Sequence, residues 1–457
     1  MNCKWVKIIA LIGAIVMMFS SLCVSAATPP ETSTAALLLI DADTGEVLYG
    51  KNENARMYPA STTKIMVALL ALENLELDEV VTANNSALGL LPPGHTNIGI
   101  LNGEQLTVRQ LLYALMLPSA GDAANVLGER ISGSVDEFVK LMNKRALELG
   151  MKNTNYMNAS GAHDELHYTT ASDMALLART VMKNATFREI VATDVYIIGA
   201  TEKYPEERRL LNTNHLVSKK RSSKYFYEYA TGIKTGFTNP AKRCLVSSAS
   251  KNGINLICVA LGADIIDGEQ MDFVDSRNLF EYGFSSYVRK PVVQKGEVIS
   301  EVKIKSAKGD DDHVLLEAGA DISQLLPNDK KLGEVTRKAT LYKNEVEAPI
   351  KKGEVLGEME YFVDSVSVGK VPLVATKDYA RDPIKHIFNV IISILTSPWL
   401  YMPFVLFFVA LVIIRQYNYN KRKKQRALAR RQQKQVEAEA RRAAMRKDKY
   451  LEDFLKK

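Results

Sequence analysis

The chain has 457 residues, and its 59 Lys and Arg against 52 Asp and Glu give a formal net charge of +7. The positive charge is confined to the end of the chain. The residues from Arg415 onward carry 16 Lys or Arg against five acids, a surplus of 11 that exceeds the total by four. The remaining chain is therefore slightly acidic, and the composition does not require nucleic-acid binding.

The N-terminus has the three parts of a signal peptide. A basic segment, Met1–Lys7, precedes an apolar one, Ile8–Val24, and Val24-Ser25-Ala26 supplies small residues for cleavage. Residues 1–26 are therefore predicted to be removed on export. Lipidation of Cys23 is a less favoured alternative, because the leucine before it is too large for the usual lipidation sequence.

The first sequence with catalytic potential is Ser61-Thr62-Thr63-Lys64. The apolar run Ile65–Leu70 follows it and predicts a buried helix that begins here. Side chains three residues apart share a helix face, so Lys64 can reach Ser61 and act as its base. Burial and the charge of Lys234 would lower the pKa of Lys64, as a lysine base requires. Taken alone, the pair could equally be a helix N-cap and a solvated lysine.

Ser119 is the second candidate. Thr107 and Gln110 form a capping-box pattern that predicts a helix over 111–117, and Pro118 marks its end. A second helix is predicted from Asp122. Ser119 therefore lies on a loop between two helices, where a lone serine is usually a turn residue, and only its combination with the other motifs gives it weight.

Lys234-Thr235-Gly236 is the third motif. Two β-rich runs, Arg243–Ser248 and Ile254–Leu261, follow it around the turn Lys251-Asn252-Gly253, so the region predicts a β-meander. Gly236 lets a substrate backbone approach the strand, while Thr235 offers a hydroxyl and Lys234 a positive charge for an anionic group. The alternative is an edge-strand lysine that protects against aggregation.

Ser-x-x-Lys, a loop serine and Lys-Thr-Gly in this order are the motif set of the penicillin-recognising serine enzymes. The chain resembles the low-molecular-weight penicillin-binding proteins of the D-alanyl-D-alanine carboxypeptidase family over residues 35–375. Leu39–Gly45, Pro59–Met66 and Thr169–Met174 extend the resemblance beyond the motifs. It implies an α/β (α+β) serine DD-peptidase/β-lactamase-like catalytic domain over residues 27–286, with an antiparallel sheet flanked by helices.

The same resemblance implies a role for each motif residue. Ser61 would be the acylated nucleophile, Lys64 its general base and Ser119 a proton relay. No metal or cofactor is implied. The remaining residues form the substrate-binding strand, Lys234, Thr235 and Gly236, and the oxyanion hole, made by the backbone N–H groups of Ser61 and Phe237.

One position departs from the family pattern. The family carries Asn two residues after the loop serine, where this chain has Gly121. Losing one preorganised hydrogen-bonding group costs about a hundredfold in rate, which slows an enzyme without abolishing it. Asn125, one helical turn further on, is a candidate substitute. The arginine that some relatives place after the last strands is also not obvious, because Gly268-Glu269-Gln270 occupies that region and Arg277 comes later.

Two near-miss motifs offer weaker alternatives. His163-Asp164-Glu165-Leu166-His167 has its histidines at the spacing of zinc peptidases, but Asp replaces the Glu that acts as base there. Glu207–Asn212 faintly resembles the deacylation loop of class A β-lactamases, but it is one residue too long. Cys244 and Cys258 would remain after export on neighbouring strands, where free buried thiols are favoured over a disulfide.

From residue 287 the chain changes character. Short alternating runs, Glu301–Lys305, Thr336–Thr340 and Gly357–Val363, are separated by Gly, Asp and Asn turns. They predict a small all-β domain over residues 287–376. This domain carries no catalytic motif, and in the resembling family such a domain holds the active site away from the membrane.

The last part of the chain predicts a membrane anchor. In residues 377–396, polar side chains on one helical face, Lys385, His386, Asn389 and Ser393, indicate an amphipathic helix at the membrane interface. Residues 397–414 are apolar after the break at Ser397-Pro398 and predict a transmembrane helix. The basic tail, 415–457, would stay cytoplasmic, which puts the catalytic domain outside. By default the tail binds anionic lipid, and a cytoplasmic partner is the alternative.

These observations predict a membrane-anchored serine D,D-carboxypeptidase. It would remove the terminal D-alanine from peptidoglycan stem pentapeptides through an acyl-enzyme on Ser61, take part in cell-wall biogenesis, and be acylated by penicillin and other β-lactams. The alternative is a wall-binding scaffold with weakened turnover and a partner-docking tail, which Gly121 favours. A β-lactamase is a third possibility, distinguished by fast release of hydrolysed penicillin.

Overall fold

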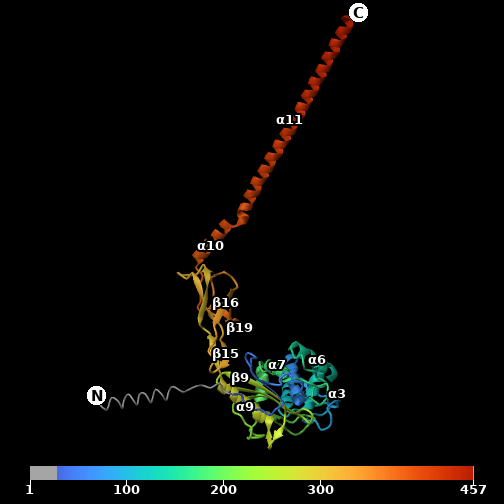
Figure 1. The fold of residues 1–457 in the computed structure, drawn as a ribbon, viewed down its shortest axis with the longest axis vertical. Helices are drawn as coiled ribbons and strands as arrows, with labels where there is room; N and C mark the ends of the chain where they lie inside the picture. Colours follow the sequence, from blue (N-terminus) through green and yellow to red (C-terminus); the bar gives the residue numbers. More distant parts are fainter. Residues whose placement is uncertain (1–27, 456–457) are drawn as a thin grey trace, which may run out of the picture. The chain divides into compact units, whose positions relative to one another are not determined.

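The computed structural model describes residues 28–455 (Figure 1), so the predicted signal peptide lies outside the described residues. The described chain forms two compact units. The first contains the chain up to Val292 together with residues 322–336 and 362–368. The second contains residues 293–321 and 337–361 and the chain from Gly369 onward.

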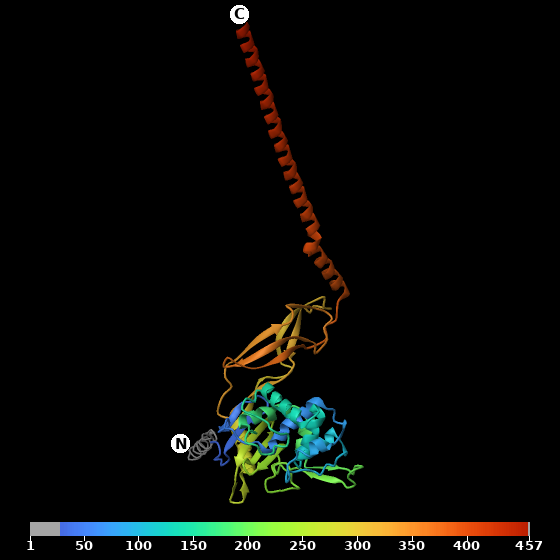
Figure 2. The same ribbon diagram turned by 90° about the vertical axis from the view of Figure 1, so that its right-hand side faces the viewer.

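A five-stranded antiparallel sheet with the order β2-β1-β9-β8-β7 organises the first unit. The predicted meander β7-β8-β9 is confirmed. β1 pairs with β9, so strands from the two ends of the unit lie side by side, and β7 is left at one edge (Figure 2). The strands are β1 (Ala36–Asp41), β2 (Val47–Lys51), β7 (Ala230–Thr238), β8 (Lys242–Lys251) and β9 (Ile254–Ala263).

Alternating side chains supply a core on each face of this sheet. In β1, Leu38 and Ile40 belong to one core, whereas Leu37 and Leu39 belong to the other. Most of the helices cover the first face, and α9 (Met271–Ser286) packs on the second. Because successive side chains point to opposite faces, a strand covered on both sides reads as one continuous apolar run, as β1 does.

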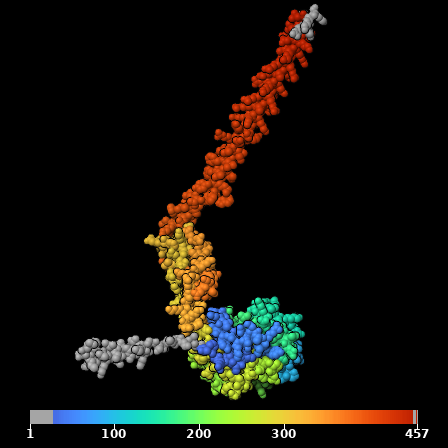
Figure 3. All heavy atoms as spheres, viewed as in Figure 1, coloured from blue at the N-terminus to red at the C-terminus, as the bar shows by residue number. Residues whose placement is uncertain are grey.

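The helical layer frames the site. α4 (Val108–Met116) begins at the predicted capping box, where Thr107 Oγ1 accepts from the N–H of Gln110 and the Gln110 side chain accepts from the N–H of Thr107. α2 contacts α5 and α6, so the blue and teal segments adjoin in Figure 3. The other helices are η1 (Ala60–Thr63), α2 (Lys64–Asn74), α3 (Asn85–Leu88), α5 (Gly121–Ser132), α6 (Val135–Glu148), α7 (Ala171–Val181) and α8 (Ala185–Ala192).

Within residues 28–455, four two-stranded sheets complete the first unit and the segments that connect its elements. They are β3 (Val80–Thr82) with β4 (Gln105–Thr107), β5 (Val195–Ile198) with β6 (Arg208–Leu211), β10 (Ile265–Ile266) with β11 (Glu269–Gln270), and β12 (Tyr287–Val293) with β15 (Ile322–Pro327). Cys244 and Cys258 are free buried thiols that belong to the cores on opposite faces of the central sheet.

A six-stranded sheet follows, with the order β16-β18-β19-β14-β13-β17. Buried and exposed residues alternate along its strands, as in β13, because one face packs on a core. The strands are β13 (Val298–Lys305), β14 (His313–Ala318), β16 (Val335–Leu341), β17 (Glu345–Glu347), β18 (Val355–Val363) and β19 (Val366–Ala375). The prediction of an all-β segment after the catalytic part is thus confirmed.

Two helices end the described chain. α10 (Pro383–Thr396) places two of its polar side chains against the six-stranded sheet and its loops. His386 Nδ1 lies 2.6 Å from Glu347 Oε1, and Asn389 donates to Ser306 Oγ at 3.2 Å. The polar face expected to meet lipid headgroups therefore has protein partners. After Ser397, α11 (Pro398–Leu455) runs on without interruption through the apolar segment and the basic tail. The helical segment from Pro383 is long and apolar enough to cross a membrane.

Candidate active site

Ser61 and Lys64 meet where η1 passes into α2. Lys64 Nζ donates to Ser61 Oγ at 2.9 Å and also bonds to the carbonyl oxygen of Ser160. The Lys64 side chain is buried in the apolar start of α2, as the sequence predicts, with a relative exposure of 2%. The two functional groups are therefore in direct contact, but through a 3-10 turn followed by the helix and not through one continuous α-helix.

Burial lowers the pKa of the Lys64 amine to about 7, because a low-dielectric surrounding penalises its charged form. The carboxylate of Asp122 acts in the opposite direction and moderates the shift. At neutral pH a large share of the amine is therefore unprotonated and able to accept the hydroxyl proton of Ser61.

A turn at residues 158–162 positions the second partner of Lys64. The side chain of Asn158 accepts from the N–H groups of Gly161 and Ala162, at 2.8 and 2.9 Å. Gly161 has a φ of +78°, and a Cβ there would lie 2.1 Å from the carbonyl oxygen of Ala60. Only glycine permits this approach, which presents the Ser160 carbonyl to Lys64. The sequence interpretation missed this turn, although the Asn-x-x-Gly spacing was visible.

The two histidines of the zinc-like motif have separate partners. The Nδ1 of His167 accepts from the N–H of Met157, so its Nε2 carries the proton and donates to Thr63 Oγ1 at 2.9 Å. Burial lowers the pKa of His167 to about 4, which keeps the ring neutral. His163 instead packs edge-on against Tyr58. His167 thus stabilises the turn between Ser61 and Lys64.

Ser119 lies between α4 and α5 with a φ of +74°, a rare conformation for a residue with a side chain. Its hydroxyl is buried and has no hydrogen-bond partner among the described residues. It lines a pocket of about 340 Å³ together with Ser61, Thr235, Gly236 and Phe237. The strained loop therefore places an unpaired hydroxyl at the pocket that Ser61 also lines.

β7 forms one wall of this pocket and carries the third motif. Gly236 lies so close to η1 that a Cβ would be 3.0 Å from Ser61 N. Thr235 Oγ1 is 2.6 Å from Thr213 Oγ1. Lys234 is buried, with its Nζ donating to the carbonyl of Thr235 at 3.0 Å. Burial lowers the pKa of Lys234 well below its usual value, and the charge of Lys64 adds to this effect.

A side chain at the position of the family asparagine would meet close neighbours in this chain. A Cβ on Gly121 would lie 2.5 Å from Leu91 Cδ1 and 3.3 Å from the carbonyl oxygen of Thr96. The amide of Asn125 does not replace the missing group, because it donates to the carbonyl of Ala87 and Asn125 does not line the pocket. Thr96 does line it. The segment before α4 thus fills the space that glycine leaves.

The pocket also contains residues that the sequence interpretation missed. Arg243 stands opposite Phe237 in the β7–β8 hairpin, and its Nε donates to the buried carboxylate of Asp272 at 2.7 Å. Its charge thus enters the pocket from β8. The signal was available, because a residue that faces the Lys-Thr-Gly strand across a tight hairpin must lie near it. The other missed residues of the pocket are Thr96, Pro118, Thr213, His215 and Arg221, whereas Gln270 comes from the region that the sequence indicated.

Arg277 is not part of this pocket. Its guanidinium lies over the ring of Tyr227, 5.8 Å from the ring centroid. Among the described residues, the structure thus brings together Ser61, Ser119, Thr235, Gly236 and Phe237 on the pocket wall, with Lys64 bonded to Ser61 and Lys234 next to Thr235.

Comparison with known proteins identifies the family. The chain matches the model of the peptidase family named D-alanyl-D-alanine carboxypeptidase over residues 23–265, and the model of the C-terminal domain of penicillin-binding protein 5 over residues 287–381. It is 33% identical over 383 residues to the D-alanyl-D-alanine carboxypeptidase DacF of Bacillus subtilis (strain 168), which covers 81% of this chain and 93% of the relative.

Solved structures agree with this assignment. Penicillin-binding protein 5 from Haemophilus influenzae is 28% identical, and the match covers 78% of this chain and 100% of that one, with a TM-score of 0.56. A peptidoglycan synthesis regulatory factor (PBP3) from Streptococcus pneumoniae, 23% identical, shares the fold over 77% of this chain and 100% of its own, with a TM-score of 0.65.

The fold and the motif set therefore define a penicillin-binding serine DD-peptidase with a C-terminal β domain, and the predicted fold class is confirmed. The chain belongs to the D-alanyl-D-alanine carboxypeptidase family and is a serine-type peptidase of that family, as the sequence predicts.

Proposed function

We propose that the protein removes the terminal D-alanine from peptidoglycan stem pentapeptides through an acyl-enzyme on Ser61. The observation that carries this proposal is the 2.9 Å bond between Lys64 Nζ and Ser61 Oγ, with the pKa of Lys64 lowered to about 7. A neutral amine at this distance is a competent base for a serine hydroxyl.

In acylation, Lys64 takes the proton of Ser61 Oγ, and the oxygen attacks the carbonyl carbon of the penultimate D-alanine. The negative charge that forms on the carbonyl oxygen is stabilised by the backbone N–H groups of Ser61 and Phe237. When the intermediate collapses, the bond to the terminal amine breaks and the amine receives a proton through Ser119. D-alanine leaves, and Ser61 carries the acyl group as an ester.

In deacylation, a water molecule gives a proton to the neutral Lys64 and attacks the ester carbon. The bond to Ser61 Oγ breaks, the proton on Lys64 returns to the serine, and the shortened stem peptide leaves as a carboxylic acid that gives its proton to solvent. The unpaired hydroxyl of Ser119 supports its role as the relay, because a relay must be free to exchange a proton with the substrate.

The substrate carboxylate binds at the β7–β8 side of the pocket, where Arg221 and Arg243 line it beside Thr235. Arg243 is held by Asp272, so its guanidinium is preorganised for a planar carboxylate. Lys234 and Gly236 complete the binding strand: Lys234 donates to the carbonyl of Thr235, and Gly236 allows close approach. Penicillin carries a carboxylate next to its reactive amide and acylates Ser61 by the same route.

The remaining segments anchor this domain. We assign residues 27–286 to the catalytic domain, 287–376 to the β domain, 377–396 to the linker and α10, 397–414 to a transmembrane helix and 415–457 to a cytoplasmic tail. The basic tail directly after the span supports an orientation with the catalytic domain outside the cell membrane. Anionic lipid is the default partner of the tail, and a cytoplasmic protein partner is the alternative.

The decisive experiment is D-alanine release from a Lys-type and a diaminopimelate-type pentapeptide by the full-length protein in detergent. We expect release by the wild type and none by Ser61→Ala, with a persistent penicillin adduct on the wild type alone. Release that persists in Ser61→Ala would refute the mechanism. Folded wild-type protein that releases nothing from either peptide would instead support the scaffold alternative, for which Gly121 is the specific argument.

A further inference from the structure

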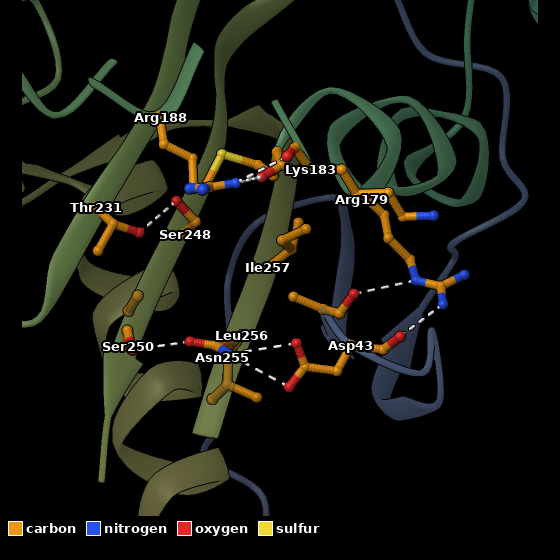
Figure 4. A pocket seen from close by; sticks show the side chains of 13 residues that line it. Asp43, Arg179, Lys183, Arg188, Thr231, Ser248, Ser250, Asn255, Leu256 and Ile257 are labelled. Carbon is orange, nitrogen blue, oxygen red and sulfur yellow. Dashed lines mark hydrogen bonds between the residues drawn. The ribbon is translucent and has the colours of Figure 1, made fainter. Parts of the chain in front are cut away.

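We propose that a second pocket in the first unit binds a phosphate ester. It has a volume of about 470 Å³ and lies between the ends of α7 and α8 and the strands β7, β8 and β9 (Figure 4). None of the residues that line it lines the pocket of Ser61. It is therefore separate from the site of the family reaction.

The lining residues carry more positive than negative charge. Arg179, Lys183 and Arg188 contribute three cations, and Asp43 contributes the one carboxylate among the residues that line the pocket. That carboxylate accepts from Arg289 Nη2 at 2.7 Å, and the same nitrogen donates to Asp41 Oδ1 at 2.9 Å, so Arg289 serves two acids. The three cations of the pocket still outnumber the one carboxylate among its lining residues.

The hydrogen bonds of the two arginines orient them without neutralising them. Arg179 donates from Nε and Nη2 to the backbone carbonyls of Ala42 and Asp43, at 3.1 and 2.7 Å. Arg188 donates from Nη1 alone to the carbonyls of Met182 and Lys183, at 2.7 and 3.0 Å. Figure 4 shows both guanidinium groups held in this way. A carbonyl is a neutral acceptor, so the full positive charge stays available to an anion.

Further donors at the pocket have no protein partner in the described part of the chain. These are Nε and Nη2 of Arg188, and Nζ of Lys183. A guanidinium with one nitrogen fixed and two neighbouring N–H groups free matches two oxygens of a phosphate. Lys183 adds a mobile point charge.

The rest of the pocket offers hydroxyl groups, an apolar wall and enough volume for an organic group. Thr231 Oγ1 and Ser248 Oγ lie 2.8 Å apart, and both residues line the pocket. Met182, Leu256 and Ile257 provide an apolar wall. The volume is in the range of pockets for small organic ligands. The site thus fits a phosphate attached to a small polar carbon skeleton better than it fits a free phosphate ion.

The test is a calorimetric titration of the full-length protein in detergent with glycerol 3-phosphate, inorganic phosphate and glycerol. We expect glycerol 3-phosphate to bind in the millimolar range or more tightly, more tightly than phosphate, and glycerol not to bind. Lys183→Gln should weaken binding roughly fivefold, as the loss of an exposed charge pair does. Arg188→Gln should weaken it about tenfold, because a charge-assisted pair of bonds is lost.

Matched measurements keep this test specific. Lys152→Gln removes an exposed lysine that does not line the pocket and should leave binding unchanged. Lys183→Gln removes no hydrogen bond of the fold, so it keeps the test valid if Arg188→Gln destabilises α7. Both pocket variants should release D-alanine at the wild-type rate. No binding by the wild type, equal affinity for phosphate and its ester, or equal weakening in Lys152→Gln would each overturn the proposal.

Discussion

The rate of acylation should depend on pH through the protonation of Lys64. The base must be neutral to accept the proton of Ser61, and burial lowers its pKa to about 7. The neutral fraction is then roughly a tenth at pH 6, half at pH 7 and nine tenths at pH 8. We therefore expect the second-order rate constant for acylation to rise roughly ninefold between pH 6 and pH 8 and to level off above that.

A fluorescent penicillin provides the assay, because the adduct on Ser61 is counted directly and deacylation does not enter. The full-length protein is mixed with excess label at a series of pH values, and the pseudo-first-order rate is measured. Asp122 supplies a control, since its charge raises the pKa of Lys64. Asp122→Asn keeps an acceptor for the N–H groups of Ile98 and Ile100 and should move the midpoint to lower pH.

The reasoning is refuted if the midpoint lies near the ordinary lysine pKa, or if the rate does not change over this range. A midpoint that moves to higher pH in Asp122→Asn would contradict only the claim that the charge of Asp122 raises the pKa of Lys64. A check of the folded state at each pH, by circular dichroism, separates a loss of base from a loss of structure.

Three further outcomes are expected. Gly121→Asn restores the family residue, but its new side chain meets Leu91. It should therefore lower the free energy of unfolding by about 1–3 kcal/mol in urea titrations and should not raise D-alanine release. Recovery of stability in the double variant with Leu91→Ala would support the steric cause, and faster D-alanine release by the single variant would contradict it. Arg243→Lys should raise KM about tenfold for the pentapeptide with little change in kcat, because the two parallel N–H donors for the carboxylate are lost while the charge remains. An unchanged KM would show that Arg243 does not bind the substrate carboxylate. Lys64→Met should abolish acylation yet raise the free energy of unfolding by roughly 1–2 kcal/mol at pH 7. The pKa of Lys64 is lower in the folded than in the unfolded state, so the stability of the wild type rises with pH above about 7. The extra stability of Lys64→Met over the wild type should therefore shrink toward pH 10. Extra stability that grows with pH would contradict the direction of this pKa shift.

The sequence alone determined the features that depend on neighbours in the chain. The three-residue spacing of Ser61 and Lys64, the capping box of Thr107 and Gln110, and the β-rich runs of β8 and β9 around a short turn are local patterns. Each is encoded within a few residues, because helix turns, caps and hairpins are closed by short-range hydrogen bonds. Such patterns were sufficient to predict the fold class and the family.

Only the tertiary structure decided which distant groups join the site. The Ser160 carbonyl reaches Lys64 from 96 residues away in the sequence, and Arg243 is held by Asp272 on α9. Leu91 occupies the space beside Gly121, and two polar side chains of α10, His386 and Asn389, contact Glu347 and Ser306. These contacts depend on how separate elements pack, which no local spacing records. Packing fixes which side chains share a volume, and therefore which charges, hydroxyls and apolar groups become neighbours.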